Sequence, residues 1–260
     1  MNQANSGSIM QGLLAVKSKT FLTPHYIRIV LSGDDIGNFE YAQVGDNNKL
    51  LIPNEYTDFT VEGRPEGDIR TYTLRALDLA KGEMTVDFVA HGEEGPASSW
   101  AINAQVSDQL MVFMKQKNKQ LFKPADWYGL VGDHTALPVI SVILESLPED
   151  AVGKVLLEVY SSEDVLELLK PVGVDIQWIY NDRPGEQTLL PDFFTQVEIP
   201  ENGTRFLFSA AEFQSVRAIQ DQIRSKEFIS RDEWQSFSYW KYGVAESDPK
   251  NNKKELTHRG

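Results

Sequence analysis

Residues 127–147 read WYGLVGDHTALPVISVILESL and carry the clearest structural pattern in the chain. The first part is an almost continuous apolar run, as expected for a strand that is buried on both faces. In the second part the apolar side chains recur at helical spacing. Between them, Gly132 permits close approach of another group, and Asp133 and Thr135 can cap a helix. The stretch therefore predicts a strand, a turn and a helix in direct succession.

The same alternation continues toward the C-terminus. Strands are expected in KVLLEVYS (154–161), DIQWIYND (175–182) and RFLFSA (205–210), with helices near 163–169 and over 212–226. Strands that alternate with helices are typical of a parallel sheet of the doubly wound kind. The chain contains no GxGxxG sequence, so the standard Rossmann fingerprint is absent.

Toward the N-terminus the pattern changes to short apolar or β-branched runs bounded by turn residues. These runs lie at residues 26–31, 49–53, 70–77, 83–91 and 108–114. Several short strands joined by turns indicate a closed or nearly closed antiparallel barrel.

Pro124 interrupts the chain between the two patterns. We therefore predict a β-barrel domain over residues 1–124 and an α/β domain over residues 125–260, the latter ending in a polar tail. The polar ends of the chain, residues 1–9 and about 247–260, are expected to be mobile.

The composition excludes several classes of protein. A formal net charge of −13 repels phosphates, so neither nucleic acid nor an anionic membrane is expected as a partner. The absence of cysteine excludes disulfides, Cys-ligated zinc and iron–sulfur clusters, and the four histidines show no metal-ligand spacing. We find no signal-peptide pattern and no apolar run of the roughly 18 residues that a transmembrane helix needs. A cytoplasmic location and, by default, a monomer are expected.

The segment Arg70-Thr71-Tyr72-Thr73-Leu74-Arg75 combines cations, an aromatic ring and hydroxyls on one predicted strand. A guanidinium fork suits a pyrophosphate, a tyrosine ring can lie flat on an isoalloxazine, and a threonine can bond the flavin edge. On chemistry alone, the alternative is an exposed arginine, a packed tyrosine and ordinary strand threonines.

Residues 91–101, HGEEGPASSWA, form a glycine-rich turn that opens a predicted helix. Pro96 suits the first helical turn, and the free amides at a helix start can bind a phosphate, helped by serine hydroxyls. A plain capped helix is the alternative interpretation.

Together these pieces resemble the siderophore-interacting protein family, flavin-dependent ferric-siderophore reductases within the ferredoxin-reductase-like superfamily. The resemblance extends from about residue 20 to about residue 243. It rests on the ordered set Leu22–Arg28, Lys49–Pro53, Arg70–Arg75, His91-Gly92 through Trp100-Ala101, Val131–Asp133, Thr135–Pro138, Ala211-Glu212 and Tyr239–Gly243.

The resemblance implies an antiparallel FAD-binding barrel followed by a parallel-sheet NAD(P)H-binding domain, as in ferredoxin-NADP reductase. It assigns to FAD the residues Arg70, Thr71, Tyr72, Thr73, His91, Gly95, Pro96, Ala97, Ser98 and Trp100. It assigns to the nicotinamide dinucleotide the residues Asp133, Thr135, Ala136, Ala211 and Glu212. Tyr239 or Trp240 would cover the flavin where nicotinamide enters, although core packing is an equal alternative for both.

The implied activity passes electrons from NAD(P)H through FAD to an Fe(III)-siderophore and releases Fe(II). No residue is required as acid, base or nucleophile, because placement of the reacting groups is sufficient. Ferric siderophores are bulky and many are anionic, so Lys49 and Lys241 are expected to bind the substrate. Lys250, Lys253 and Lys254 are further candidates, and a solvated surface charge is the alternative for each lysine.

The choice between NADH and NADPH depends on the charge beside the adenosine ribose. Ser161, Ser162, Glu163 and Asp164 follow a predicted strand without a cation, which favours NADH over a 2′-phosphate. Arg183 after the next strand could reverse this preference.

The sequence departs from the family pattern at several positions. Asn47-Asn48 replace the usual His-Val before Lys49, Met114–Lys117 replace Gly-Pro-Arg-Gly, and Ala210-Ala211 replace Ala-Gly before Glu212. His134 replaces a glutamate, and a proton-transfer role for it is less expected than that of an ordinary loop histidine.

Two other functions stay open at this point. The chain could be a general NAD(P)H-flavin reductase or a ferredoxin-type oxidoreductase with an external ferredoxin as donor, although its acidity opposes an acidic ferredoxin. A binding module that captures a siderophore without catalysis is the third alternative, and it would leave the flavin motif without a role.

Overall fold

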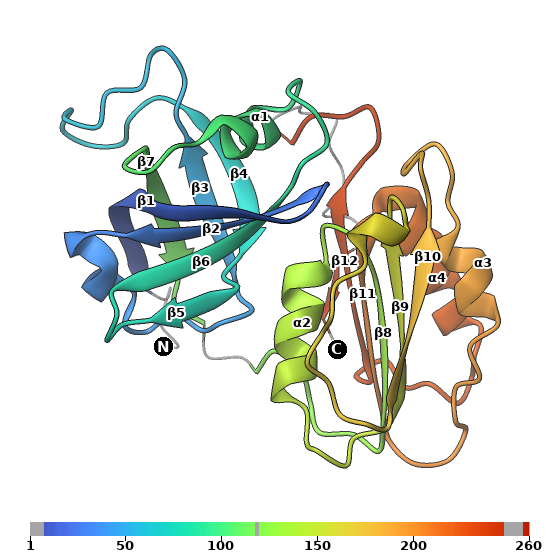
Figure 1. Ribbon diagram of the computed structural model, residues 1–260. Coiled ribbons are helices and arrows are strands. Elements are labelled where there is room, and N and C mark those ends of the chain that lie inside the picture. Colours follow the sequence, from blue (N-terminus) through green and yellow to red (C-terminus); the bar gives the residue numbers. More distant parts are fainter. Residues whose placement is uncertain (1–7, 118–119, 247–256, 260) are drawn as a thin grey trace, which may run out of the picture. The chain divides into compact units, whose positions relative to one another are not determined.

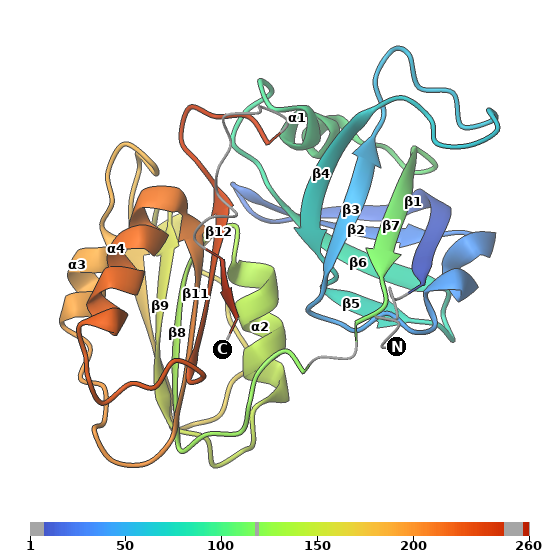
Figure 2. The same ribbon diagram turned by 180° about the vertical axis from the view of Figure 1, so that it is seen from behind.

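The computed structural model describes residues 8–117, 120–246 and 257–259, and the chain divides into two compact units (Figures 1 and 2). Unit 1 is Met1–Leu121 and unit 2 is Phe122–Gly260, so the observed division lies between residues 121 and 122. Phe122 belongs with unit 2 because its ring packs on Tyr128 and Phe206, with ring centroids 6.1 and 6.2 Å away.

Unit 1 is one antiparallel sheet of seven strands that curls into a half-barrel. The strands are β1 (Ile9–Thr23), β2 (Tyr26–Ser32), β3 (Asn47–Ile52), β4 (Asp68–Thr73), β5 (Ala76–Asp78), β6 (Glu83–Val89) and β7 (Gln109–Lys115). Their order is β4-β3-β7-β1-β2-β6-β5, so the two edge strands are consecutive in the chain. The antiparallel barrel expected from the sequence is confirmed.

The predicted strand over residues 70–77 is in fact two strands at opposite edges of this sheet. After β4, the amide of Leu74 still bonds the carbonyl of Asp46, at 2.8 Å. The next amide, of Arg75, instead bonds the carbonyl of Thr85 in β6, at 3.0 Å. The chain therefore passes from one edge to the other within two residues, and this crossing brings the edges together.

The long strand β1 was not predicted. Its buried residues Met10, Leu14 and Val16 alternate as in any half-buried strand, but Gly12 interrupts the apolar series. A Cβ at Gly12 would lie 2.7 Å from the Cβ of Asp35 in the 3-10 helix η1 (Asp34–Phe39), so close packing requires glycine there. The polar N-terminal end of the chain concealed this pattern.

The core of unit 1 lies inside the half-barrel and under helix α1 (Pro96–Asn103). Its completely buried side chains include Leu14, Ile27, Ile29, Leu31, Phe39, Leu50, Val86, Phe88, Leu110 and Val112. Helix α1 packs against β2, β3, β4 and β6, which places its first turn beside the sheet edge that carries the Arg70–Thr73 segment.

Unit 2 is a sheet of five parallel strands with a short antiparallel strand at one edge. The strands are β8 (Trp127–Asp133), β9 (Gly153–Val159), β10 (Val174–Tyr180), β11 (Arg205–Glu212), β12 (Trp234–Trp240) and β13 (His258–Arg259), in the order β10-β9-β8-β11-β12-β13. The doubly wound parallel sheet expected from the sequence is confirmed. The direction of winding reverses between β8 and β11, and ligands of such sheets bind at the carboxyl ends of the strands at this point.

Helices cover both faces of this sheet. Helix α2 (Leu137–Ser146) lies on one face, and α3 (Leu190–Thr195) and α4 (Phe213–Arg224) lie on the other (Figures 1 and 2). The second face buries Val131, Leu156, Ile179, Leu190, Phe194, Leu207, Val216, Ile219 and Ile223 in one cluster. Helix α3 and strand β12 were not predicted, since each is short and their apolar residues lack a long period.

The predicted helix near residues 163–169 is wrong. Only a 3-10 turn, η2 (Ser162–Asp164), is present, and Val165 already has an extended backbone. Leu169 is 75% exposed, so the leucines of this segment form no buried stripe. Pro171 also disfavours helical geometry at the residue before it.

Of the polar C-terminal tail that the sequence predicts to be mobile, the structure describes residues 257–259. Strand β13 pairs with β12, and the ring of His258 stacks on Trp234 with centroids 3.6 Å apart. Residues 247–256 of the predicted tail lie outside the described residues.

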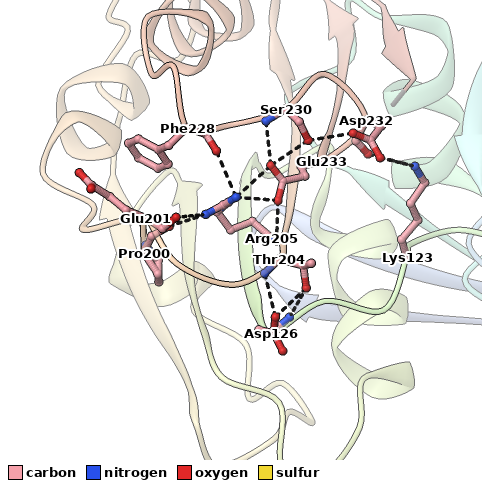
Figure 3. A network of polar contacts seen from close by, with 10 residues as sticks. All are labelled: Lys123, Asp126, Pro200, Glu201, Thr204, Arg205, Phe228, Ser230, Asp232 and Glu233. Carbon is pink, nitrogen blue, oxygen red and sulfur yellow. Dashed lines mark hydrogen bonds and ion pairs between the residues drawn. The ribbon is translucent and has the colours of Figure 1, made fainter.

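The amino-terminal edge of the unit 2 sheet is closed by a polar network around Arg205 (Figure 3). Arg205 is 8% exposed, and its guanidinium bonds the carbonyls of Pro200, Glu201 and Phe228 and pairs with Glu233 at 2.9 Å. In the same region, Asp126 accepts bonds from the amide and hydroxyl of Thr204, at 2.7 and 2.8 Å. This edge is occupied by structural contacts, which leaves the carboxyl edge for a ligand.

Within the described residues, no helix combines the length and the apolar character needed to cross a bilayer.

Candidate functional site

In unit 1, three aromatic rings form a row beside the sheet edge. The Tyr72 ring lies 4.4 Å from Phe88, and Phe88 lies 5.7 Å from Trp100. Phe88 is fully buried, whereas Tyr72 and Trp100 are half-buried. Sequence reasoning selected Tyr72 and Trp100 but missed Phe88, which is the residue that joins them. Its only signal was an aromatic residue at an inward position of a strand.

The two cations predicted for unit 1 have different surroundings. Arg70 donates to the carbonyl of Ile69 at 2.9 Å and lies 3.7 Å from Asp68, and its side chain is 16% exposed. Lys49 on β3 is exposed and pairs in register with Thr71 on β4, so both point to the outer side of the sheet. Thr73, the last residue of β4, is buried.

The turn before α1 is held by Ser98. Its hydroxyl accepts a bond from the His91 amide at 3.0 Å and donates to the Gly92 carbonyl at 2.6 Å, and the residue is 1% exposed. The hydroxyl is therefore engaged inside the turn. The expectation that this hydroxyl contacts a phosphate is a poor fit to that geometry, so Ser98 shapes the turn instead.

Gly95 is the N-cap of α1 and lies under the His91 ring. A Cβ at Gly95 would lie 2.9 Å from Cε1 of His91, so the ring packs against a position where only a hydrogen fits. Pro96 and Ala97 follow in the first turn, and the first bond of the helix runs from the Ser99 amide to the Gly95 carbonyl, at 2.9 Å. The earlier amides of the turn are those that a helix leaves for a ligand.

This arrangement fits the parts of FAD. A half-buried tyrosine ring suits the flavin, and a helix start beside it suits the pyrophosphate. Glu93 and Glu94 are exposed in the same turn and oppose a phosphate, so the positive charge of Arg70 is needed to balance them. Among the described residues, Arg70 contacts the Ile69 carbonyl and, more distantly, the Asp68 carboxylate.

In unit 2, Asp133 is the centre of a hydrogen-bond network at the carboxyl edge of the sheet. It is 1% exposed. Oδ1 accepts bonds from the Thr135 amide, at 2.9 Å, and from the Thr135 hydroxyl. Oδ2 accepts bonds from the Glu212 amide at 2.9 Å and from Nε1 of Trp240 at 2.7 Å. Four donors at one carboxylate stabilise its negative charge in a buried place.

Glu212 continues this network as the N-cap of α4. It is 3% exposed, and Oε2 accepts bonds from the amides of Gln214 and Ser215. Oε1 accepts a bond from the Tyr242 amide at 3.2 Å. The structure thus brings together three of the predicted dinucleotide-site residues, Asp133, Thr135 and Glu212, and adds Trp240, which was predicted to cover the flavin.

A register shift between β11 and β12 directs the indole of Trp240 toward Asp133. Ala211 pairs with Ser238 and Glu212 pairs with Trp240, so Tyr239 is an extra residue between them. Such irregularities redirect side chains at the ends of strands. Tyr239 itself is half-buried.

Two predicted residues of this edge are packing residues. Ala136 is completely buried and Ala211 is 1% exposed. A Cβ at Gly132 would lie 2.6 Å from the Cβ of Ala136, so the glycine admits the start of α2. Neither alanine side chain is accessible to a ligand in this arrangement.

Glu158 and Tyr160 are polar residues of this edge, buried and half-buried, that the prediction left out, and the buried His134 lies beside Tyr160. Glu158 in β9 pairs in register with Asp133 and is 4% exposed. Burial and the charge of Asp133 raise the pKa of Glu158 to about 7 and that of Tyr160 to about 12. The His134 ring lies 4.8 Å from Tyr160 and 6.1 Å from Trp240, as expected for packing. The sequence signal for Glu158 was an acid inside the apolar run KVLLEVYS.

Of the cations predicted for unit 2, Lys241 and Arg183 are described by the structure and the tail lysines are not. The amine of Lys241 lies 4.6 Å from the centre of the Phe213 ring at the start of α4. Arg183 is exposed and 3.9 Å from Asp182. Lys250, Lys253 and Lys254 lie outside the described residues, and no cluster of metal-ligating side chains occurs among the residues that are described.

Two family models match consecutive parts of the chain. The model of the siderophore-interacting FAD-binding domain matches residues 15–116, and the model of the siderophore-interacting protein matches residues 125–243. The ferric vibriobactin reductase ViuB of Vibrio cholerae is 33% identical over 245 residues, which cover 90% of each chain.

Solved structures show the same architecture. The siderophore-interacting protein SipS from Aeromonas hydrophila superimposes with a TM-score of 0.83 at 29% identity, covering 95% of this chain and 98% of the other. A ferredoxin-NADP+ reductase from Plasmodium falciparum has a TM-score of 0.59 at 11% identity, covering 92% of this chain and 100% of the other. At that identity the likeness concerns the fold alone.

Proposed function

The chain belongs to the siderophore-interacting protein family, and on this premise we propose that it is a ferric-siderophore reductase. The match to the FAD-binding domain and the likeness to a ferric reductase support a flavin oxidoreductase that uses FAD, and we propose a nicotinamide dinucleotide as its electron donor. One observation carries the proposal: the aromatic rings of Tyr72, Phe88 and Trp100 and the turn before α1 lie within residues 15–116, which match the FAD-binding domain.

In unit 1 we assign a binding role to each element of the site. Tyr72, supported from behind by Phe88, orients the flavin ring, and Thr73 at the end of β4 lies at the flavin edge. Arg70 and the amides at the start of α1 bind the pyrophosphate. Gly95 and His91 shape the turn that receives the ribityl and phosphate groups, with Thr71 on the outer side of the strand.

In unit 2 the Asp133 network keeps the carboxyl edge in one arrangement for the dinucleotide. Asp133 holds Trp240 through its indole N–H, and Glu212 holds the loop that follows Trp240 through the Tyr242 amide. The end of β12 is therefore bonded to the buried carboxylate of Asp133 at the end of β8, and the loop after β12 is bonded to that of Glu212. A rigid edge of this kind positions a nicotinamide without taking part in proton transfer.

The chemistry needs no acid or base from the protein. When bound, FAD would supply the chemistry of accepting a hydride and releasing its electrons one at a time. One NAD(P)H provides two electrons, which reduce two Fe(III) chelates and leave NAD(P)+ and one proton. Hard oxygen donors hold Fe(III) through its high charge and hold Fe(II) much less tightly, so reduction opens the chelate.

Lys49 is the residue we assign to the siderophore. It is an exposed cation on β3 and pairs in register with Thr71 of the flavin-binding strand. Replacing Lys49 with Ala should raise the KM for anionic ferric chelates and leave the flavin content unchanged. Lys81→Ala, which removes an exposed lysine in the turn before β6, is the matched control. We assign Lys241 a weaker role in the same step.

The function is tested with purified protein under anaerobic conditions. The protein should be yellow, NADH or NADPH should bleach it, and ferric hydroxamates or catecholates should restore the colour while a chelator traps Fe(II). Bleaching that no ferric chelate reverses would favour a general flavin reductase. Colourless protein that does not take up FAD would contradict the proposal, and Arg70→Ala should reproduce that loss of flavin.

We further propose that NADH is preferred over NADPH. Glu163 follows β9 and is exposed, and the hydroxyl of Ser161 caps its amide at 3.2 Å. A carboxylate there opposes a 2′-phosphate and can bond a ribose hydroxyl. Glu163→Lys should move the ratio of kcat/KM toward NADPH, and Arg183→Ala should not; the reverse result would assign the ribose to Arg183.

A cytoplasmic location, a monomeric state and an external ferredoxin as alternative donor stay predictions from the sequence. Gel filtration with light scattering tests the oligomeric state, and reduced ferredoxin offered in place of NADH tests the donor.

A further inference from the structure

Glu158 is a buried acid that the proposed reaction does not use. It is the second-last residue of β9 and is 4% exposed. It pairs in register with Asp133, so the two side chains leave neighbouring strands on the same face of the sheet. This is the carboxyl edge at the point where the winding reverses, where dinucleotides bind in sheets of this type.

The surroundings of Glu158 satisfy only part of its carboxyl group. The Asn181 side chain and the Leu190 amide donate hydrogen bonds to it. Its Oε2 is buried and has no hydrogen-bond partner among the described residues. Asp133, by contrast, receives four donors, so the negative charge of the pair is best placed on Asp133.

The charged groups that act on Glu158 are carboxylates. Asp133 on β8 and Glu212 at the end of β11 both oppose ionisation of Glu158, while Asn181 and the Leu190 amide favour it. On its own side of the sheet edge, Tyr160 is subject to Asp133 and to Asp164 of η2. Burial, the largest cause, together with these two carboxylates raises the pKa of Glu158 to about 7.

We infer that Glu158 holds an exchangeable proton at the carboxyl edge of the unit 2 sheet, and that binding of a nicotinamide dinucleotide is coupled to uptake of one proton by this carboxylate. This inference rests on the proposed function, because it takes the carboxyl edge of unit 2 as the dinucleotide site. The binding step is balanced as ionised Glu158 plus dinucleotide plus one proton from solvent, giving neutral Glu158 in the complex.

The coupling has an electrostatic cause. A dinucleotide carries a negatively charged pyrophosphate. When this anion binds near the buried carboxylates of Asp133, Glu158 and Glu212, it favours protonation of the carboxylate whose negative charge is least stabilised. Glu158 is that group, since no residue that the structure describes donates a hydrogen bond to its Oε2. Affinity should therefore weaken as the pH rises through the range in which free Glu158 loses its proton.

Calorimetric titration of the oxidised holoprotein with NAD+ tests the coupling. NAD+ is a suitable probe because oxidised FAD does not react with it and its pyrophosphate keeps its charge between pH 6 and about 9. Titrations in two buffers of different ionisation enthalpy give the protons taken up. We expect uptake of roughly half a proton near pH 7.5, little uptake at pH 5.5, and a roughly tenfold weaker affinity at pH 9 than at pH 6.

Glu158→Gln should bind NAD+ without proton uptake and with an affinity that no longer depends on pH. Glu149→Gln, which changes an exposed acid of the same unit, should behave as the wild type. If Glu158→Gln does not fold, the pH profile of uptake by the wild-type protein decides, since a profile without a maximum above pH 6 would overturn the inference. Binding with the same uptake in wild type and Glu158→Gln would also overturn it. Failure of both NAD+ and NADP+ to bind would instead contradict the dinucleotide site itself.

Discussion

Nε1 of Trp240 donates a 2.7 Å hydrogen bond to Oδ2 of Asp133, and this bond links two residues 107 positions apart in the chain. It joins the end of β12 to the end of β8, with the Glu212 amide of β11 bonded to the same oxygen at 2.9 Å. Three strand ends of unit 2 therefore depend on one carboxylate, and the proposed dinucleotide site depends on their arrangement.

Replacing Trp240 with Phe should separate the hydrogen bond from the ring. The variant keeps an aromatic side chain but leaves Oδ2 of Asp133 with one donor fewer. Since the carboxylate is buried, we expect a loss of about 1–3 kcal/mol in the free energy of unfolding and a raised KM for the nicotinamide donor. Chemical denaturation and steady-state kinetics measure the two effects. Trp178→Phe, in β10, is the control; equal effects in both variants would contradict a special role for the indole N–H.

The raised pKa of Glu158 also predicts a pH dependence of stability. Unfolded Glu158 ionises near pH 4.5, whereas the folded protein retains the proton to about pH 7. Between these values the folded state binds more protons, so stability falls as the pH rises and is lower by about 3 kcal/mol above pH 7. Glu158→Gln should remove this difference, and denaturation of both proteins at pH 5 and pH 8 measures it. An unchanged pH dependence in the variant would show that Glu158 is ionised throughout.

Asn48 offers a stabilising substitution in unit 1. It is completely buried, and neither Nδ2 nor Oδ1 has a hydrogen-bond partner among the described residues. Asn48→Val removes the uncompensated amide at similar volume and favours the strand, so the free energy of unfolding should rise by about 1–3 kcal/mol. The same change at exposed Asn47, which accepts a bond from Lys117, should give no gain. A loss of stability in Asn48→Val would reveal an internal water that bonds the amide.

Gly95 and His91 provide a paired test of the FAD turn. A methyl group in Gly95→Ala would lie 2.9 Å from Cε1 of His91 and would displace that exposed ring. Because the backbone of Gly95 is extended and suits any residue, stability should change by less than about 0.5 kcal/mol. FAD affinity, measured by flavin fluorescence, should fall if the ring position matters. A second substitution, His91→Ala, should then cause no further loss, and additive losses would contradict the shared mechanism.

The parts of the fold that local pattern determines were predictable. Strand β8 and helix α2 follow from the spacing of apolar residues along the chain, which is visible within each short segment. The same holds for the antiparallel strands β2, β3, β6 and β7. The segment 163–169 shows the limit of this reasoning, since the spacing of its leucines resembles a helix but Leu166 and Leu168 are only half-buried and Leu169 is exposed.

The sequence by itself marked Arg70–Thr73, the turn at His91 and the edge at Asp133 as candidate sites through the ordered set of motifs that resembles the family, and their binding roles stay predictions. Only the tertiary structure decided how they act. It directs the Ser98 hydroxyl into the turn, places Phe88 between Tyr72 and Trp100, and sets Glu158 beside Asp133. These relationships arise between distant segments, where burial and neighbouring charge, rather than local spacing, determine what a side chain contacts and whether it holds a proton.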